Sequence, residues 1–272
     1  MNFATLPDGA TLAYDVLDFT DPWTTPEPVI LVHGFSKNRK FWFEWIPQLS
    51  RKYRLICPDQ RGHGDSSPPP AGFKMALEPF ADDLAAFLDV LSLKSAHLVM
   101  AEFSSTVAVE FAIKYPQRIK SLTLVGFAYN YRASKVDRSE WVRICETEGA
   151  LAWARATTGN RLPVGTSAEM REWYIAQQGR MPAWFLAGLF RFNPDIDLTE
   201  RLPLVKVPTL IIAGSQALQG SIETVRLGAR LMPDCRLVEL AGMPYNVMSA
   251  AAGPCVDATM TFLAEQTKRA RG

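Results

Sequence analysis

Short apolar runs that alternate with helical patterns are the feature of this 272-residue chain that most narrows its fold. The runs with the length and composition of buried strands are residues 29–32, 54–57, 97–101, 121–125, 208–213 and 235–240. The helical patterns cover residues 40–49, 75–91, 103–115, 221–231 and 250–267. Because parallel strands joined by crossover helices produce such an alternation, we predict an α/β fold with a doubly wound, mostly parallel sheet.

Two segments depart from this alternation. A Pro-Asp-Gly turn signal separates residues 2–6 from residues 11–17 and predicts a β-hairpin at the start of the chain. Residues 129–203 contain no convincing strand, and their Trp and Phe residues are spread over helical patterns. We therefore expect a helical cap at residues 129–203, inserted into a core formed by residues 1–128 and 204–272.

Composition excludes several classes of partner. Lys and Arg total 29 against 28 Asp and Glu, so no net charge attracts nucleic acid or an anionic membrane. No apolar stretch approaches the ~18 residues that a membrane-spanning helix needs, and the start of the chain has no signal-peptide pattern. Four cysteines without a CxxC pair and three unclustered histidines predict neither a disulfide framework nor a metal site. We expect a cytoplasmic protein without cofactor that binds a small hydrophobic molecule, and the sequence leaves a homodimer open.

Four motifs occur in one order along the chain. His33-Gly34-Phe35 follows an apolar run, and DQRGHGDS occupies residues 59–66. YPQRI at residues 115–119 ends a helical pattern, and VPTLIIAG at residues 207–214 contains a later strand. Together these motifs resemble those of the α/β-hydrolase superfamily, and the resemblance covers nearly the whole chain. It implies the family's sheet with a cap and a catalytic site at the strand ends.

The family's nucleophile elbow, a strand, sharp turn and helix, is matched by residues 96–108, but its GxSxG pattern is absent. An alignment without gaps places Glu102 at the nucleophile position and Met100 two residues before it. Ser104 and Ser105 stand where glycines are usual. Because the nucleophile has a positive φ and its neighbours are crowded, we expect a slightly opened or strained elbow.

The same resemblance indicates that the rest of the catalytic triad is replaced. Ala217 falls at the position of the family's acid, and Tyr245 at that of its histidine. His33 and His63 belong to loop motifs, and His97 begins the strand that leads to the elbow, at its far end. Since a Ser-His-Asp mechanism needs an imidazole that accepts and returns a proton, we expect no standard serine-hydrolase mechanism.

A carboxylate at this elbow favours proton transfer. The resemblance places two backbone N–H donors, of Phe35 and Phe103, in an oxyanion hole beside Glu102. A partly desolvated carboxyl group there could exchange a proton with a carbonyl compound, with Tyr245 donating a hydrogen bond or a proton. Our main hypothesis is therefore a cofactor-independent lyase, cyclase, dehydratase or isomerase in which Glu102 and Tyr245 are catalytic.

Several alternatives remain open. Ser104 or Ser105 could be the nucleophile, although this would shift the helix register, and Glu102 could itself attack the substrate. The chain could be an atypical hydrolase of esters or lactones. It could also be a non-catalytic ligand-binding protein, although an unpaired buried carboxylate is costly unless a basic residue such as Arg132 or Arg39 pairs with it.

The expected pocket is apolar, because the cap is rich in aromatic residues. These side chains should face a hydrophobic or aromatic carbonyl compound. The residues predicted to contact it are Ser36, Trp42, Met100, Trp141 and Trp184.

Overall fold

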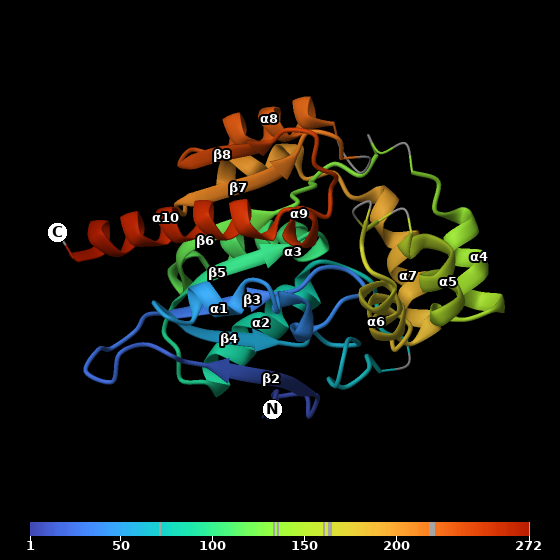
Figure 1. The fold of residues 1–272 in the computed structure, drawn as a ribbon, viewed down its shortest axis with the longest axis horizontal. Helices are drawn as coiled ribbons and strands as arrows, with labels where there is room; N and C mark the ends of the chain where they lie inside the picture. Colours follow the sequence, from blue (N-terminus) through green and yellow to red (C-terminus); the bar gives the residue numbers. More distant parts are fainter. Residues whose placement is uncertain are drawn as a thin grey trace.

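The computed structural model describes residues 1–70, 72–132, 134, 136–159, 161–162, 165–217 and 221–271. These residues form an eight-stranded sheet of order β1-β2-β4-β3-β5-β6-β7-β8 (Figure 1). The strands are β1 (Asn2–Thr5), β2 (Thr11–Leu17), β3 (Pro28–Val32), β4 (Arg54–Pro58), β5 (Ala96–Ala101), β6 (Ile119–Val125), β7 (Thr209–Gly214) and β8 (Cys235–Leu240).

Strand direction follows the predicted pattern. β1 pairs with β2 antiparallel, with Asn2 opposite Tyr14, and β2 pairs with β4 antiparallel. The remaining strands pair in parallel, and Met100 of β5 lies opposite Leu124 of β6. Parallel neighbours require crossover connections, which the helices supply. The predicted hairpin and the mostly parallel, doubly wound sheet are both confirmed.

Helices cover both faces of the sheet (Figure 1). The longer helices outside the insertion are α2 (Glu78–Val90), α3 (Phe103–Lys114), α8 (Ile222–Leu231) and α10 (Ala252–Arg271), and the short ones are α1 (Ile46–Leu49) and α9 (Val247–Ala250). Side chains of α2, α3 and α8 belong to one buried cluster, whereas those of α1, α9 and α10 belong to another. Each strand from β3 to β7 supplies alternate residues to the two clusters, as a strand buried on both faces must.

Among the described residues, four α-helices lie between β6 and β7, beyond one end of the sheet (Figure 1). They are α4 (Ser139–Thr147), α5 (Ala150–Thr158), α6 (Ala168–Gln178) and α7 (Ala183–Phe192). Helical insertion is therefore confirmed, whereas the limits at residues 129 and 203 stay predictions. An isolated bridge between Asn130 and Asp197 lies where the chain enters and leaves the insertion.

The prediction of one continuous helix at residues 40–49 is wrong. The chain forms a 3-10 turn at Arg39–Trp42 and then the separate helix α1. Pro47 lies in the first turn of α1, where its missing N–H group cannot bond to the carbonyl of Phe43. Residues 33–38 form a loop between β3 and this turn, beyond the carboxyl end of β3. No helix within the described ranges is both long and apolar enough to cross a membrane.

Candidate active site

Glu102 lies in a sharp turn between β5 and α3. Its backbone has φ 53° and ψ −121°, a conformation that costs a non-glycine residue about 1–3 kcal/mol. The Glu102 N–H group donates to the Val125 carbonyl at 2.7 Å, and its own carbonyl accepts from the Ser105 N–H group at 2.9 Å. These bonds to the neighbouring strand and the helix hold the strained turn that the elbow motif predicted.

The serines after Glu102 are buried in structural hydrogen bonds. The Ser104 hydroxyl donates to the His33 carbonyl at 2.5 Å, and the Ser105 hydroxyl donates to the Glu102 carbonyl. Both residues are fully buried, and neither lines the cavity described below. The structure accommodates Ser104 without taking Glu102 out of its positive φ, and it leaves neither hydroxyl placed as a nucleophile.

Two glycines make room for Glu102 and the loop above it. A Cβ atom at Gly34 would lie 2.2 Å from Glu102 Oε2. A Cβ atom at Gly126 would lie 2.5 Å from the Tyr245 carbonyl oxygen and 3.6 Å from Glu102 Cγ. The carboxylate therefore packs directly against the backbone of the loop that carries Phe35.

Lys37 pairs with Glu102. Its Nζ lies 2.6 Å from Glu102 Oε1 and 2.6 Å from Asn246 Oδ1. The side chains of Lys37 and Glu102 are 3% and 8% exposed, so the ion pair is buried. Burial lowers the pKa of Lys37, and the negative charge of Glu102 opposes that change. No hydrogen bond reaches Glu102 Oε2 from the described residues, so this oxygen can still accept a proton.

Sequence reasoning missed Lys37 and named other partners for the carboxylate. Arg39 instead pairs with Asp15, Asp59 and Asp65, and Arg132 is exposed. The available signal was the position of Lys37, three residues after Gly34 in a loop that the family motif places beside the elbow. Only the fold of that loop brings its ammonium group to Glu102.

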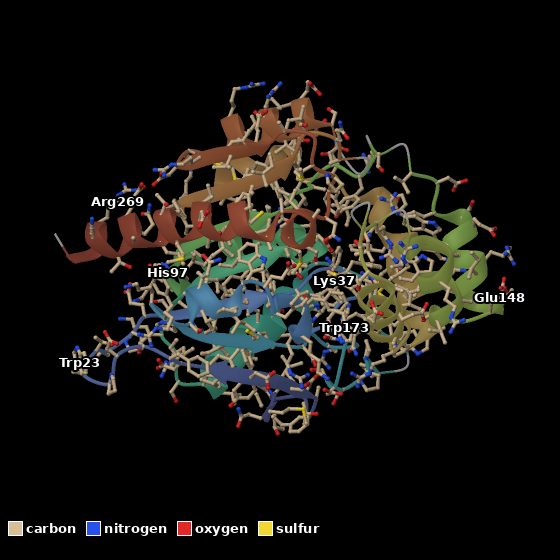
Figure 2. The ribbon with its side chains drawn as sticks, in the orientation of Figure 1. Trp23, Lys37, His97, Glu148, Trp173 and Arg269 are labelled. Carbon is tan, nitrogen blue, oxygen red and sulfur yellow. The ribbon has the colours of Figure 1, made fainter. Side chains whose placement is uncertain are left out.

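A cavity of about 320 Å³ lies over Glu102, between the strand ends and the inserted helices. Six residues predicted for the site line it, namely Phe35, Ser36, Glu102, Phe103, Trp141 and Tyr245. Lining residues that were not predicted include Lys37, Tyr131, Arg138, Trp153, Arg161 and Phe190. Figure 2 places Lys37 near the junction of the sheet and the inserted helices, and His97 toward the other end of the sheet. The cavity thus combines an aromatic wall with several charged groups.

Phe35 and Phe103 contribute aromatic side chains to the cavity wall and also carry backbone N–H donors. Their rings meet edge to face, with centroids 5.7 Å apart. Neither backbone N–H group has a hydrogen-bond partner among the described residues. Phe103 begins α3, whose first N–H groups lack partners within the helix. Both amides therefore remain available to an oxygen atom of a ligand, as an oxyanion hole requires.

Tyr245 lines the cavity, but its hydroxyl is directed to another tyrosine. The Tyr245 and Tyr131 hydroxyl oxygens lie 3.3 Å apart, and no hydrogen bond joins Tyr245 to Glu102. Burial raises the pKa of both phenols, which keeps them protonated. Tyr245 can therefore donate to a ligand, and its catalytic role stays a prediction. Ala217, which follows β7, offers no carboxylate there.

Three predicted contact residues lie away from the cavity, and these predictions are wrong. Trp42 is fully buried against Trp45, with ring centroids 5.0 Å apart, on the α10 side of the sheet. Met100 packs among side chains of α2 and α3, because its position in β5 directs it to a sheet face. Trp184 is 48% exposed, since α7 buries the next residue, Phe185, instead.

The histidines serve as scaffold. The Gln60 N–H group donates to His33 Nε2 at 3.0 Å, and His33 Nδ1 lies 2.8 Å from the Gly34 carbonyl, so the ring is neutral. Burial lowers the pKa of His33 to about 4 and that of His63 to about 3. His97 contacts Ser121 at 2.7 Å, at the start of β5. Within the described ranges, no group of three or more His, Cys, Asp or Glu residues could hold a metal ion.

Comparison with known proteins agrees with this geometry. Residues 27–143 match the alpha/beta hydrolase fold family, and the chain is 33% identical over 200 residues to a putative carbamate hydrolase of Pantoea ananatis. That alignment covers 71% of this chain and 72% of the relative. The chain belongs to the alpha/beta hydrolase fold family.

Two further proteins are similar to this chain, one over about a third of its length and the other over nearly all of it. The chain is 37% identical over 102 residues to 2-hydroxy-6-oxo-2,4-heptadienoate hydrolase of Pseudomonas putida, an alignment that covers 36% of this chain and 37% of the relative. The crystal structure of a hydrolase from Pseudomonas aeruginosa has a TM-score of 0.83 and 26% identity, and covers 96% of this chain and 97% of the other. These relatives are hydrolases.

Proposed function

We propose that this protein is an atypical hydrolase that cleaves a hydrophobic ester or lactone, with Glu102 as general base toward water. One observation carries the proposal: Glu102 lines a cavity together with Phe35 and Phe103, whose backbone N–H groups have no partner among the described residues. A base and two oxyanion donors in one buried site are the groups that acyl cleavage needs.

Each group has a defined part in the reaction. The amides of Phe35 and Phe103 donate to the substrate carbonyl oxygen, and Glu102 Oε2 removes a proton from a water molecule. The water oxygen bonds to the carbonyl carbon, and the negative charge moves to the carbonyl oxygen. Collapse of this intermediate breaks the bond to the leaving oxygen, which takes the proton from Glu102. An acid and an alcohol result, or a hydroxy acid from a lactone.

Lys37 positions the base in this scheme. It is bonded to Oε1 and not to Oε2, so it compensates the charge of Glu102 while leaving one oxygen for proton transfer. Asn246 holds the same ammonium group from the other side. The ion pair therefore fixes the orientation of the carboxylate in the cavity.

Hydrolysis fits the relatives better than the lyase or isomerase reaction expected from the sequence. The named activities of the relatives at 2-hydroxy-6-oxo-2,4-heptadienoate and 2-hydroxymuconate semialdehyde are hydrolytic. Both alignments cover little more than a third of those proteins, so the relatives support the reaction type more than the substrate. The same base and amides could also act on a carbon acid, which product analysis would distinguish.

A second candidate is non-catalytic ligand binding. The ion pair with Lys37 favours it, because a paired carboxylate no longer carries the cost of an isolated buried charge. On this hypothesis Glu102 is part of a binding surface, and no bond of the ligand changes.

Nitrophenyl esters of increasing acyl length and an aromatic lactone, dihydrocoumarin, test the proposal. We expect hydrolysis of the longer and aromatic esters, with no labelling by a fluorophosphonate probe, because Ser104 and Ser105 lie outside the cavity and no histidine is among the described residues that line it. Labelling of a serine would contradict the proposed mechanism. Tight binding of esters that stay intact would favour the ligand-binding candidate instead.

A further inference from the structure

Arg138 lines the cavity and pairs with no carboxylate of the described residues. It is 6% exposed, and the only hydrogen bond of its side chain with the described residues runs from Nη1 to the Val136 carbonyl at 3.1 Å. Its guanidinium carbon lies 5.6 Å from the centre of the Tyr131 ring and 6.0 Å from that of the Trp141 ring. Since a guanidinium has five N–H donors, most of the hydrogen-bonding capacity of Arg138 is unused.

Arg161, a second arginine of the cavity wall, differs in this respect. It donates to the Thr157 carbonyl and hydroxyl, and also to Thr158 and Gln178. Its guanidinium carbon lies 4.4 Å from the centre of the Trp153 ring. Neutral groups thus occupy Nε and Nη2 of Arg161, whereas Arg138 uses one donor only, so Arg138 has more donors to offer a ligand.

The charges of the cavity wall do not balance. Its charged residues are Lys37, Arg138 and Arg161 on the positive side and Glu102 on the negative side. Lys37 and Glu102 compensate each other, so the two arginine charges remain without a counter-ion in the wall. Buried charges without a partner are costly, and a bound anion would remove this cost.

We propose that Arg138 binds a carboxylate of the ligand, so that the cavity takes a hydrophobic acid rather than a neutral hydrophobic compound. A guanidinium that lies against aromatic rings can bind a carboxylate through two parallel hydrogen bonds. The aromatic residues Phe35, Trp141 and Phe190 would then enclose the apolar body of the ligand.

This inference rests on the proposed function where it names the substrate. The substrate would be an ester or lactone that carries a separate carboxylate, anchored at Arg138 while its carbonyl group lies at the amides of Phe35 and Phe103. The ring of Tyr131 faces Arg138, and its hydroxyl contacts Tyr245. These two tyrosines therefore form the wall along which the ligand would extend from its anchor.

Equilibrium binding of matched acids and amides tests the anion site. Phenylacetate, phenylbutyrate and phenylhexanoate are compared with their primary amides by titration calorimetry near neutral pH. We expect at least one of the acids to bind about tenfold or more tightly than its amide. Arg138→Gln should abolish this preference and Arg138→Lys should restore part of it, since lysine keeps the charge but not the paired donors.

Arg143→Gln is the matched control, because Arg143 lies on α4 close to Arg138 in sequence but is exposed and pairs with Glu140. It should keep the full preference for the acid. Equal affinity for every acid and its amide, or an unchanged preference in folded Arg138→Gln, would overturn the anion site. Because binding needs no turnover, a failure to hydrolyse esters would overturn the proposed function and leave this inference standing.

Discussion

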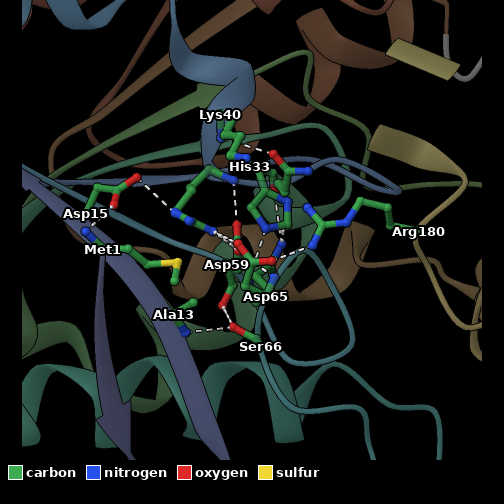
Figure 3. Close-up of polar contacts among 12 residues, drawn as sticks. Met1, Ala13, Asp15, His33, Lys40, Asp59, Asp65, Ser66 and Arg180 are labelled. Atoms are coloured by element: carbon green, nitrogen blue, oxygen red, sulfur yellow. Dashed lines mark hydrogen bonds and ion pairs between the residues drawn. The ribbon is translucent and has the colours of Figure 1, made fainter. Parts of the chain in front are cut away.

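Two buried groups of charges lie at the same end of the sheet and are built differently. Around Asp59, one arginine meets three carboxylates, because Arg39 bonds to Asp15 at 2.8 Å, to Asp65 at 2.9 Å and to Asp59 (Figure 3). Asp59 also accepts from the backbone N–H groups of Arg39 and Asp65. The cavity over Glu102 has three cations and a single carboxylate among its described lining residues, and Arg138 leaves most of its donors unused.

The difference separates structural charges from those available to a ligand. Arg39 bonds to the carboxylates of Asp15, Asp59 and Asp65, and Asp59 bonds to Arg39 and to two backbone N–H groups, so these charges hold the DQRGHGDS loop onto the sheet. The cavity charges have incomplete partners and border a space of about 320 Å³. Buried ionic groups are therefore a sign of a binding site only where their hydrogen-bonding capacity is unfilled.

Removal of Arg39 should have the largest effect on stability. Arg39→Met leaves the fully buried Asp59 without its counter-charge, which should lower the free energy of unfolding by about 3–5 kcal/mol. Urea unfolding followed by circular dichroism measures this loss. A loss below about 1 kcal/mol would show that the backbone N–H groups alone stabilise Asp59.

Removal of Lys37 should lower the free energy of unfolding somewhat less than removal of Arg39, and a second substitution should restore most of the loss. Lys37→Met leaves the Glu102 carboxylate without its counter-ion at the border of a cavity, so we expect a loss of about 3 kcal/mol in the same unfolding experiment. Lys37→Met combined with Glu102→Gln should recover most of it, because no unpaired charge remains. Additive losses in the double variant would show that the two residues do not stabilise each other.

Acid should weaken the scaffold through its neutral histidines. The folded-state pKa of His33, about 4, lies below the ordinary value of 6.5 because burial disfavours the charged ring. A lowered pKa gives stability that is complete above pH 6.5 and is lost as the pH falls from 6.5 toward 4. For His33 the loss at pH 5 should be about 2 kcal/mol, and it should disappear in His33→Gln. Equal losses in both proteins would assign the acid sensitivity to other groups.

Removal of the ion pair between Arg180 and Asp65 should have the smallest effect on stability. It joins the inserted helices to the Asp59 group, but the Arg180 side chain is 39% exposed. Arg180→Gln should therefore lower the free energy of unfolding by less than about 1 kcal/mol. A larger loss would mean that the insertion depends on this contact for its stability.

Much of the fold was predictable, because strands buried on both faces leave continuous apolar runs such as those of β5 and β7. The elbow was predictable from its flanking residues even though Glu102 replaces the usual residue. Lys37 was not, since an ion pair between residues 65 positions apart depends on how the loop after β3 folds. Trp42 and Met100 were misplaced because an aromatic or apolar residue near a motif can equally face the core.

The arginines of the cavity wall had no signal in the sequence. Arg138 and Arg161 lie in the inserted segment among other arginines, including Arg143 and Arg155, and nothing in their spacing distinguishes them. Arg138 directly precedes α4 and Arg161 follows α5, and only the folded insertion brings both side chains to the cavity wall. The balance of charges within a cavity depends on the tertiary structure. The nearly neutral net charge of the whole chain, +1, therefore gave no sign of it.

The most direct test of the account is the turnover of Glu102→Gln on an ester that the unmodified protein hydrolyses. Glutamine keeps the shape of the side chain and can still accept a hydrogen bond from Lys37, but it cannot take a proton from water. The account predicts that kcat/KM falls about a hundredfold or more while affinity for phenylbutyrate changes by less than about tenfold. An unchanged kcat/KM would contradict the role of Glu102 as the general base.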